Sequence, residues 1–175
     1  MPNWCGNCVT LRHENPEMIK RAVDAFAAGK FCEEFYPIPA ELKGTSSPNR
    51  TNADALIEKT GYADWYDFCV NEWGTKWDFG SGDGINVVEE NECVLYFDSA
   101  WSPPLAIYDL LTSEGFDVYA DSHEPGMCFV GRYTNGELEE YEATPGNCPE
   151  DMDEMWCITE TAEMYADEDA EDCEE

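Results

Sequence analysis

Residues 93–97 have the sequence CVLYF, an unbroken apolar run. Such a run is typical of a central β-strand that is covered on both faces. Residues 84–90 also have strand-like composition, and the turn at residues 89–91 predicts that the two strands pair. Residues 102–104, with the sequence SPP, open a predicted helix that ends at Gly115.

On the N-terminal side of this pair, residues 7–13 alternate between apolar and polar side chains, with Val9 and Leu11 on one face. That period of two predicts a half-buried strand. Residues 15–17, with the sequence NPE, then supply an N-cap, a proline at the first helical position and an acid in the first turn. We therefore predict an amphipathic helix that ends at Gly29.

The stretch from residue 30 to 84 has a looser pattern, and we predict that it is an insertion packed on the main sheet. Two prolines require residues 35–39 to be extended. Short helices are expected over residues 53–59 and 65–73, the second with Asp64 as its N-cap.

Residues 116–121 alternate again and predict a further strand. In residues 127–143, the dipeptide at 135–136 is Asn-Gly, which strongly indicates a hairpin turn. The order strand, helix, insertion, strand, strand, helix, strand is that of the ferredoxin-like split β-α-β fold. We expect an α+β fold with an antiparallel sheet, in which residues 1–143 form one domain and the hairpin is an addition.

Beyond this domain, residues 144–175 form a predicted acidic extension with one short docked helix around Met152, and disorder is expected after Met164. The chain has 39 acidic and nine basic residues among its 175, with a formal net charge of -30. The last 39 residues contain 17 of the acids and no lysine or arginine. The acids are therefore clustered, whereas the acidic coat of a halophile would be spread evenly.

This charge excludes direct binding of nucleic acid, which depends on lysine and arginine beside phosphates, and it disfavours an anionic membrane. We expect a basic protein as partner and no particular oligomeric state. The predicted partner-binding residues are four carboxylates in the second half of the hairpin and four around Met152: Glu137, Glu139, Glu140, Glu142, Glu150, Asp151, Asp153 and Glu154.

The odd number of cysteines, nine, rules out a disulfide framework that pairs all of them within one chain. Residues 1–5 have neither the basic nor the apolar part of a secretory signal, and no apolar run reaches the ~18 residues of a membrane span. We therefore expect a cytoplasmic protein with mostly reduced thiols.

Cysteine and histidine give little reason to expect a metal or an active site. Cys5 and Cys8 form half of a zinc knuckle, and Cys32, Cys69 and His13 could converge, but buried cysteines more often fill cores. The acidic runs at 151–154 and 167–169 lack the ligand order of a calcium loop.

For general base catalysis only His13 and His123 are available, and we interpret His123 as an exposed edge residue. We predict no enzyme, metal or cofactor.

The tryptophans Trp4, Trp73, Trp77 and Trp101 allow two interpretations. They could fill the core between the insertion and the sheet, because large aromatic side chains dominate core energetics. Alternatively, they could form an aromatic pocket with Lys76, Asp78 and Asp98 at its rim, which would bind a small ligand.

Several motifs resemble the Api92-like proteins with a YubB-type ferredoxin-like domain, a family of phages and plasmids. The resemblance covers residues 1–142 and is carried by MPNWCGN at 1–7, NEWGTKWD at 71–78, FDSAWSPP at 97–104 and EPG at 124–126. It implies the same fold and an origin in a mobile element, but no reaction and no catalytic residues. The acidic residues after Glu142 depart from it.

Charge and resemblance together lead to a functional hypothesis. The protein is expected to be an inhibitor that occupies the nucleic-acid site of a host defence protein, of the anti-CRISPR or anti-restriction type, as a DNA mimic. The alternative is a module that binds or sequesters a small molecule in the aromatic pocket.

Overall fold

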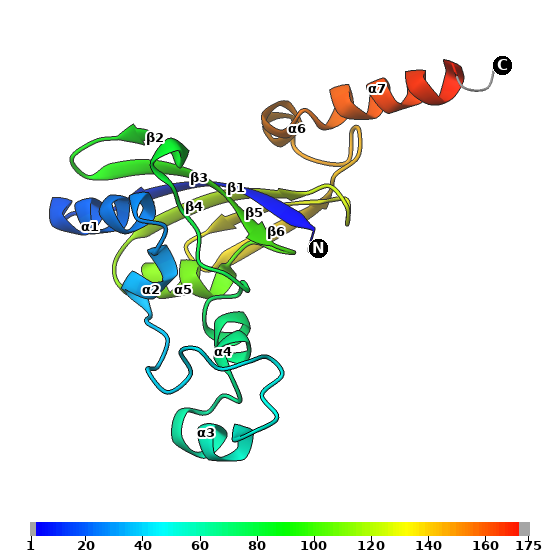
Figure 1. The fold of residues 1–175 in the computed structure, drawn as a ribbon. Helices are drawn as coiled ribbons and strands as arrows, with labels where there is room; N and C mark the ends of the chain where they lie inside the picture. The colour runs from blue at the N-terminus through cyan, green and yellow to red at the C-terminus, as the bar shows by residue number, and fades with distance from the viewer. Residues whose placement is uncertain (1–2, 172–175) are drawn as a thin grey trace.

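The structure is a computed structural model that describes residues 3–171, apart from the side chains of Val87 and of residues 166–171. Figure 1 shows a sheet with helices on both sides. The strands are β1 (Trp4–Arg12), β2 (Ile85–Val88), β3 (Glu92–Ala100), β4 (Asp117–Glu124), β5 (Phe129–Thr134) and β6 (Glu137–Glu142). The α-helices are α1 (Pro16–Ala27), α2 (Phe31–Phe35), α3 (Ala53–Thr60), α4 (Trp65–Glu72), α5 (Leu105–Ser113), α6 (Glu150–Trp156) and α7 (Ile158–Glu171).

The six strands form one sheet in the order β2-β3-β1-β4-β5-β6, and every neighbouring pair is antiparallel. The α+β class and the antiparallel sheet are therefore confirmed. The inner order β2-β3-β1-β4 is consistent with a ferredoxin-like fold. β5 and β6 extend the sheet as the hairpin that the Asn-Gly dipeptide predicts.

One face of the sheet is covered by α1, α2 and α5, which lie on the same side in Figure 1. Side chains of β1 such as Val9 and Leu11 are buried against Phe26 of α1 and Ile107 of α5, in one continuous apolar core. Burial of this kind is the main stabilising contribution to folding. The alternation predicted for the first strand is confirmed.

The other face of the sheet is largely open, which corrects the prediction for residues 93–97. β3 does lie inside the sheet, but its side chains alternate: Cys93 and Leu95 are buried, whereas Tyr96 is 43% exposed. The prediction that both faces are covered was wrong, because an apolar run does not reveal which layers cover a strand.

Two helices begin as their capping residues predict. The side-chain oxygen of Asn15 accepts a hydrogen bond from the backbone N–H of Glu17 at 3.1 Å, and that of Asp64 accepts one from Asp67 at 3.0 Å. These contacts satisfy N–H groups that the first turn leaves unpaired. The helices over residues 53–59 and 65–73 are confirmed as α3 and α4.

α2 was not predicted, and residue 35 lies in it although it was expected to be extended. Its cap is remote in the sequence. The Asp78 carboxylate accepts hydrogen bonds from the backbone N–H groups of Cys32 at 2.7 Å and Glu33 at 2.9 Å. Burial raises the pKa of Asp78, and these hydrogen bonds oppose the rise. Asp78, near the end of the predicted insertion, thus fixes α2, which lies at the start of the same stretch.

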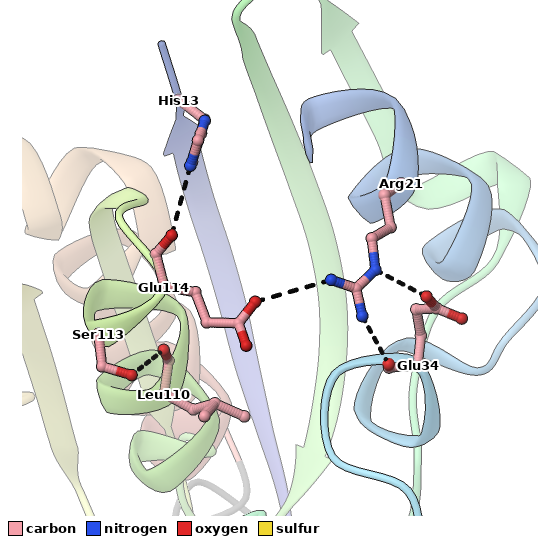
Figure 2. A network of polar contacts seen from close by, with 6 residues as sticks. All are labelled: His13, Arg21, Glu34, Leu110, Ser113 and Glu114. Atoms are coloured by element: carbon pink, nitrogen blue, oxygen red, sulfur yellow. Dashed lines mark hydrogen bonds and ion pairs between the residues drawn. The ribbon is translucent and has the colours of Figure 1, made fainter. Parts of the chain in front are cut away.

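Arg21 ties the helices of this layer to one another, as Figure 2 shows. Its Nε donates to Glu34 Oε1 at 2.7 Å, and a second guanidinium nitrogen donates to the Glu34 carbonyl at 2.9 Å. The third nitrogen lies 3.6 Å from a carboxylate oxygen of Glu114, just after α5. His13, just after β1, contacts the Glu114 carbonyl at 3.4 Å and packs against Phe116. These contacts give His13 a structural role.

The C-terminal residues cross to the open face of the sheet. Met152 of α6 and Ile158 pack on Val130 of β5, and α7 extends away from the body in Figure 1. The sequence predicts one short helix followed by disorder after Met164, whereas the structure contains two helices that reach Glu171. Residues 172–175 lie outside the described part.

Within residues 3–171, each helix is either too short or too polar to cross a lipid bilayer.

Candidate functional site

The acidic surface consists of the eight carboxylates predicted from the sequence, four on β6 and four on α6. β6 is an edge strand, and its four glutamates are all exposed. Their side chains alternate between the faces of the sheet, with Glu137 and Glu139 on one face and Glu140 and Glu142 on the other. Charges along an edge strand prevent another strand from pairing with it. We therefore expect a partner to contact β6 through its side chains.

The four carboxylates of α6 lie on the open side of the sheet, and Arg132 of β5 anchors the helix there. The Arg132 guanidinium donates to both carboxylate oxygens of Asp121, at 2.8 and 3.1 Å, and to Asp151 at 2.7 Å. The side chains of Asp121 and Arg132 are 2% and 19% exposed, so this bidentate pair is largely buried. The Arg132 guanidinium holds the pKa of Asp151 below its usual value.

Asp153 also has a partner within the chain. Its carboxylate accepts hydrogen bonds from the backbone N–H of Thr159 at 2.8 Å and from the Thr159 hydroxyl at 2.5 Å, across the junction of α6 and α7. These bonds lower the pKa of Asp153. Asp153 therefore orients α7 and is less available for a partner.

The remaining six carboxylates of the acidic surface form no ion pair within the described residues. All six are exposed. In the N-terminal part, by contrast, arginines and lysines pair with acids such as Glu34, Glu41 and Glu92. Other exposed acids in the described part, such as Glu14 and Glu89, also form no ion pair there, but six unpaired carboxylates gather at one end of the sheet: Glu137, Glu139, Glu140, Glu142, Glu150 and Glu154.

His123 lies under α6, and its interpretation as an exposed edge residue was wrong. It belongs to β4, an interior strand, and is half-buried with its ring centroid 5.6 Å from that of Trp156. Gly6 makes room for the indole, because a Cβ on Gly6 would lie 3.0 Å from Trp156 Cζ3. Burial lowers the pKa of His123, and the nearby Glu124 carboxylate opposes this.

This burial predicts a pH dependence. His123 binds a proton less readily in the folded chain than its ordinary pKa of ~6.5 implies. Its neutral form therefore contributes stability that is complete above pH ~6.5 and decreases as the pH falls below that value.

His123→Gln should reduce the loss of unfolding free energy between pH 6.5 and pH 5.5, measured by urea denaturation. His13→Gln is the control. If both variants follow the wild-type pH profile, His123 is not the group responsible.

The structure divides the predicted aromatic pocket into two clefts that share Trp77. The first cleft, about 530 Å³, is lined by Trp4, Trp77, Tyr96 and Asp98. The rings of Trp4 and Trp77 lie 5.9 Å apart, and the two side chains are 50% and 40% exposed. The second cleft, about 570 Å³, contains Lys76 and Trp73.

The other tryptophans differ in their surroundings. Trp73 is buried, and its indole N–H donates to the Tyr36 carbonyl at 2.8 Å, so Trp73 fills the core as one interpretation expects. Trp101 is exposed and has a φ of 69°, a conformation unusual for a residue other than glycine. The Lys76 ammonium lies 4.4 Å from the centre of the Trp77 ring and 5.9 Å from that of Trp101. Lys76 thus joins exposed rings by cation–π contacts.

Five of the cysteines are buried, namely Cys5, Cys8, Cys32, Cys69 and Cys93, whereas Cys128 and Cys157 are exposed. Cys5 and Cys8 are three residues apart on one strand and therefore point to opposite faces. Burial raises the pKa of Cys5 to about 12 and that of Cys69 to about 12, which keeps both as thiols. The eight cysteines in the described residues are free. Those residues contain no group of three histidine, cysteine or acidic side chains placed to hold a metal ion.

Fold and site together define an α+β protein with a six-stranded antiparallel sheet and an uncompensated acidic end. No family model matches the chain, and no curated protein matches it. Among solved structures, it is similar to a protein called api92 from Yersinia pseudotuberculosis, with 13% identical residues and a TM-score of 0.43. The match covers 83% of this chain and 100% of that one. A likeness at this level gives no information about function.

Proposed function

We propose that the chain is an acidic binding protein that occupies the nucleic-acid groove of a host defence protein and so inhibits it. The observation that carries this proposal is the set of six exposed glutamates on β6 and α6 that form no ion pair within residues 3–171. Such carboxylates attract a cationic groove over several ångströms and accelerate encounter. The motif resemblance to proteins of phages and plasmids motivates the choice of a CRISPR or restriction protein as partner.

The density of charge supports mimicry of a nucleic-acid strand. β6 spans ~20 Å at ~3.4 Å per residue, so its four carboxylates provide about one charge per 5 Å. α6 is ~10 Å long at ~1.5 Å per residue, and its two unpartnered carboxylates, Glu150 and Glu154, also provide about one charge per 5 Å. A single DNA strand has one phosphate per ~3.4 Å of axis, so the unpartnered carboxylates on both elements are about two thirds as dense as its phosphates.

Binding to candidate CRISPR and restriction proteins at salt concentrations from 50 to 300 mM tests the proposal. We expect the affinity to decrease as salt increases, and we expect the defence protein's own nucleic-acid ligand to displace this chain. An affinity that is indifferent to ionic strength, or simultaneous binding of both ligands, would contradict mimicry.

A second candidate function, a module that binds a small molecule, is favoured by the exposed tryptophans around the two clefts. Both clefts fall in the range of ~300 to 1,000 Å³ that is typical of ligand sites. Their residues lie apart in the chain from the acidic surface, so the two candidates can be tested separately.

A further inference from the structure

The second cleft collects lysines in a strongly acidic protein. We call it the lysine cleft, and the residues that matter in it are three lysines and three tryptophans: Lys30, Lys43, Lys76, Trp65, Trp73 and Trp77. It lies where α2, α4 and the loops of the insertion meet. Three of the nine basic residues of the whole chain therefore line a single concave site.

The acids of the lysine cleft are engaged by the protein itself. Asp78 accepts three backbone N–H groups, those of Cys32, Glu33 and Phe79. Glu33 accepts the backbone N–H of Ile38 at 3.1 Å and pairs with Lys43. With three lysines and two carboxylates, the lining is positive on balance, whereas the neighbouring cleft has Asp78 and Asp98 and no basic residue.

Two of the cleft lysines have no carboxylate partner within the described residues. Six basic residues of the chain form ion pairs: Arg12, Lys20, Arg21, Lys43, Lys59 and Arg132. The other three are Lys30, Arg50 and Lys76, and Lys30 and Lys76 both line the cleft. An excess of 30 negative charges offers many possible partners, so two unpaired ammonium groups in one site are notable.

Lys76 is also held in place by aromatic rings. Its ammonium lies 4.4 Å from the centre of the Trp77 ring and 5.6 Å from that of Tyr66. Cation–π contacts restrict the ammonium without neutralising its charge. The Lys76 side chain is half-buried, so it loses less conformational entropy when a ligand binds.

We propose that the lysine cleft binds a small organic anion that has a planar aromatic ring. Its carboxylate or phosphate group pairs with Lys30 and Lys76, and its ring contacts the indoles of Trp65 and Trp77. At 0.15 M salt the Debye length is ~8 Å, so the distant acidic surface is largely screened and the lining charges decide the preference. This inference rests on the second candidate function and names its ligand class.

The test compares 2-naphthoate with 2-naphthamide, which share a ring system and differ in charge. Both are titrated into the full chain, labelled with nitrogen-15, at 0.15 M salt, and the indole N–H resonances are followed. We expect 2-naphthoate to shift the Trp77 resonance and to bind at least about fivefold more tightly than the amide, as one charged hydrogen bond allows. Acetate alone should bind more weakly than 2-naphthoate.

Matched variants show whether the lysines of the cleft cause the preference for the acid over the amide. The double variant Lys30→Gln, Lys76→Gln should lose most of the preference for the acid over the amide. Arg50→Gln, which removes an exposed charge outside the cleft, should keep it. An equal loss in both variants would show a bulk charge effect and overturn the inference.

The outcomes separate the inference from the function on which it rests. Equal binding of acid and amide at Trp77 would overturn the anionic ligand class while leaving the small-molecule candidate in place. Binding of neither compound at Trp77, under conditions where the unliganded spectrum is well dispersed, would count against both. None of these results bears on the acidic surface, because the proposed groups lie on different elements.

Discussion

Replacing Arg132 with methionine is expected to lower the free energy of unfolding by about 3 kcal/mol, because the change leaves the buried Asp121 carboxylate without its partner. Arg132 joins β4, β5 and α6 through Asp121 and Asp151. Methionine keeps much of the length of the side chain, so the loss reports on charge more than on packing. Urea denaturation of the full chain measures the effect.

Two further variants show whether the broken Arg132–Asp121 pair causes this loss of stability. Replacing Asp121 with leucine in the Arg132→Met background should recover most of the stability, since an apolar pair of similar volume replaces a buried ion pair at little cost. Lys20→Met, which breaks the exposed pair with Asp24, should change stability by less than ~0.5 kcal/mol. If Arg132→Met is as mild as Lys20→Met, the buried pair is not the anchor that the geometry indicates.

Gly80→Ala is the second substitution with a large expected effect, again about 3 kcal/mol. Gly80 has a φ of 119°, a conformation that side chains rarely adopt. A Cβ would also overlap the Phe26 carbonyl oxygen and lie 3.0 Å from Phe26 Cα, at the end of α1. Relief would require helix backbone to move, because the obstacle is not a flexible side chain.

Gly82→Ala provides the matched control two residues away. A Cβ on Gly82 would meet nothing within 4 Å, and its φ lies outside the left-handed region. We expect less than ~0.5 kcal/mol for this variant. Thermal unfolding should separate the two, at ~2 to 4 °C per kcal/mol for a chain of this size. Similar melting temperatures for both variants would show that the close approach to α1 is not tight.

Local signals in the sequence were enough for most of the elements. The alternation of Val9 and Leu11, the N-caps at Asn15 and Asp64, and the Asn-Gly turn at 135–136 each act within a few residues, and each prediction is confirmed. Pattern reading succeeds here because the side chain that satisfies the backbone is a close neighbour in the sequence.

The errors have long-range causes. α2 is capped by Asp78, which is 46 residues from Cys32 in the sequence, so no local pattern predicts this helix. His123 is half-buried because Trp156, on a different layer, covers it. Tyr96 is exposed because α6 covers only part of the open face. Each of these features depends on which elements pack together, which periodicity does not encode.

The sequence predicts which residues belong to the candidate site, but it does not predict which of them pair with other residues of the chain. The clustering of acids after Glu137 is visible in the sequence, but the engagement of Asp151 by Arg132 and of Asp153 by Thr159 depends on how α6 docks. Likewise, the tryptophans and Lys76 were identified as a possible pocket. The contribution of Lys30 was missed, because it comes from the start of α2.

The central claim is that the position of the carboxylates, and not the total charge, mediates binding to a cationic partner. Two variants of the full chain test it, each with six carboxylates changed to amides. One changes the six unpartnered glutamates of the acidic surface, and the other changes six exposed acids elsewhere: Glu14, Asp54, Glu58, Asp83, Glu89 and Glu90.

Affinity for a defence protein that binds the wild-type chain, measured by calorimetry at 0.15 M salt, is the decisive quantity. We expect the acidic-surface variant to lose at least about a hundredfold in affinity, as two or more charged contacts would account for, and the control variant to stay within about threefold. Equal losses in the two variants, or none in the first, would contradict the claim.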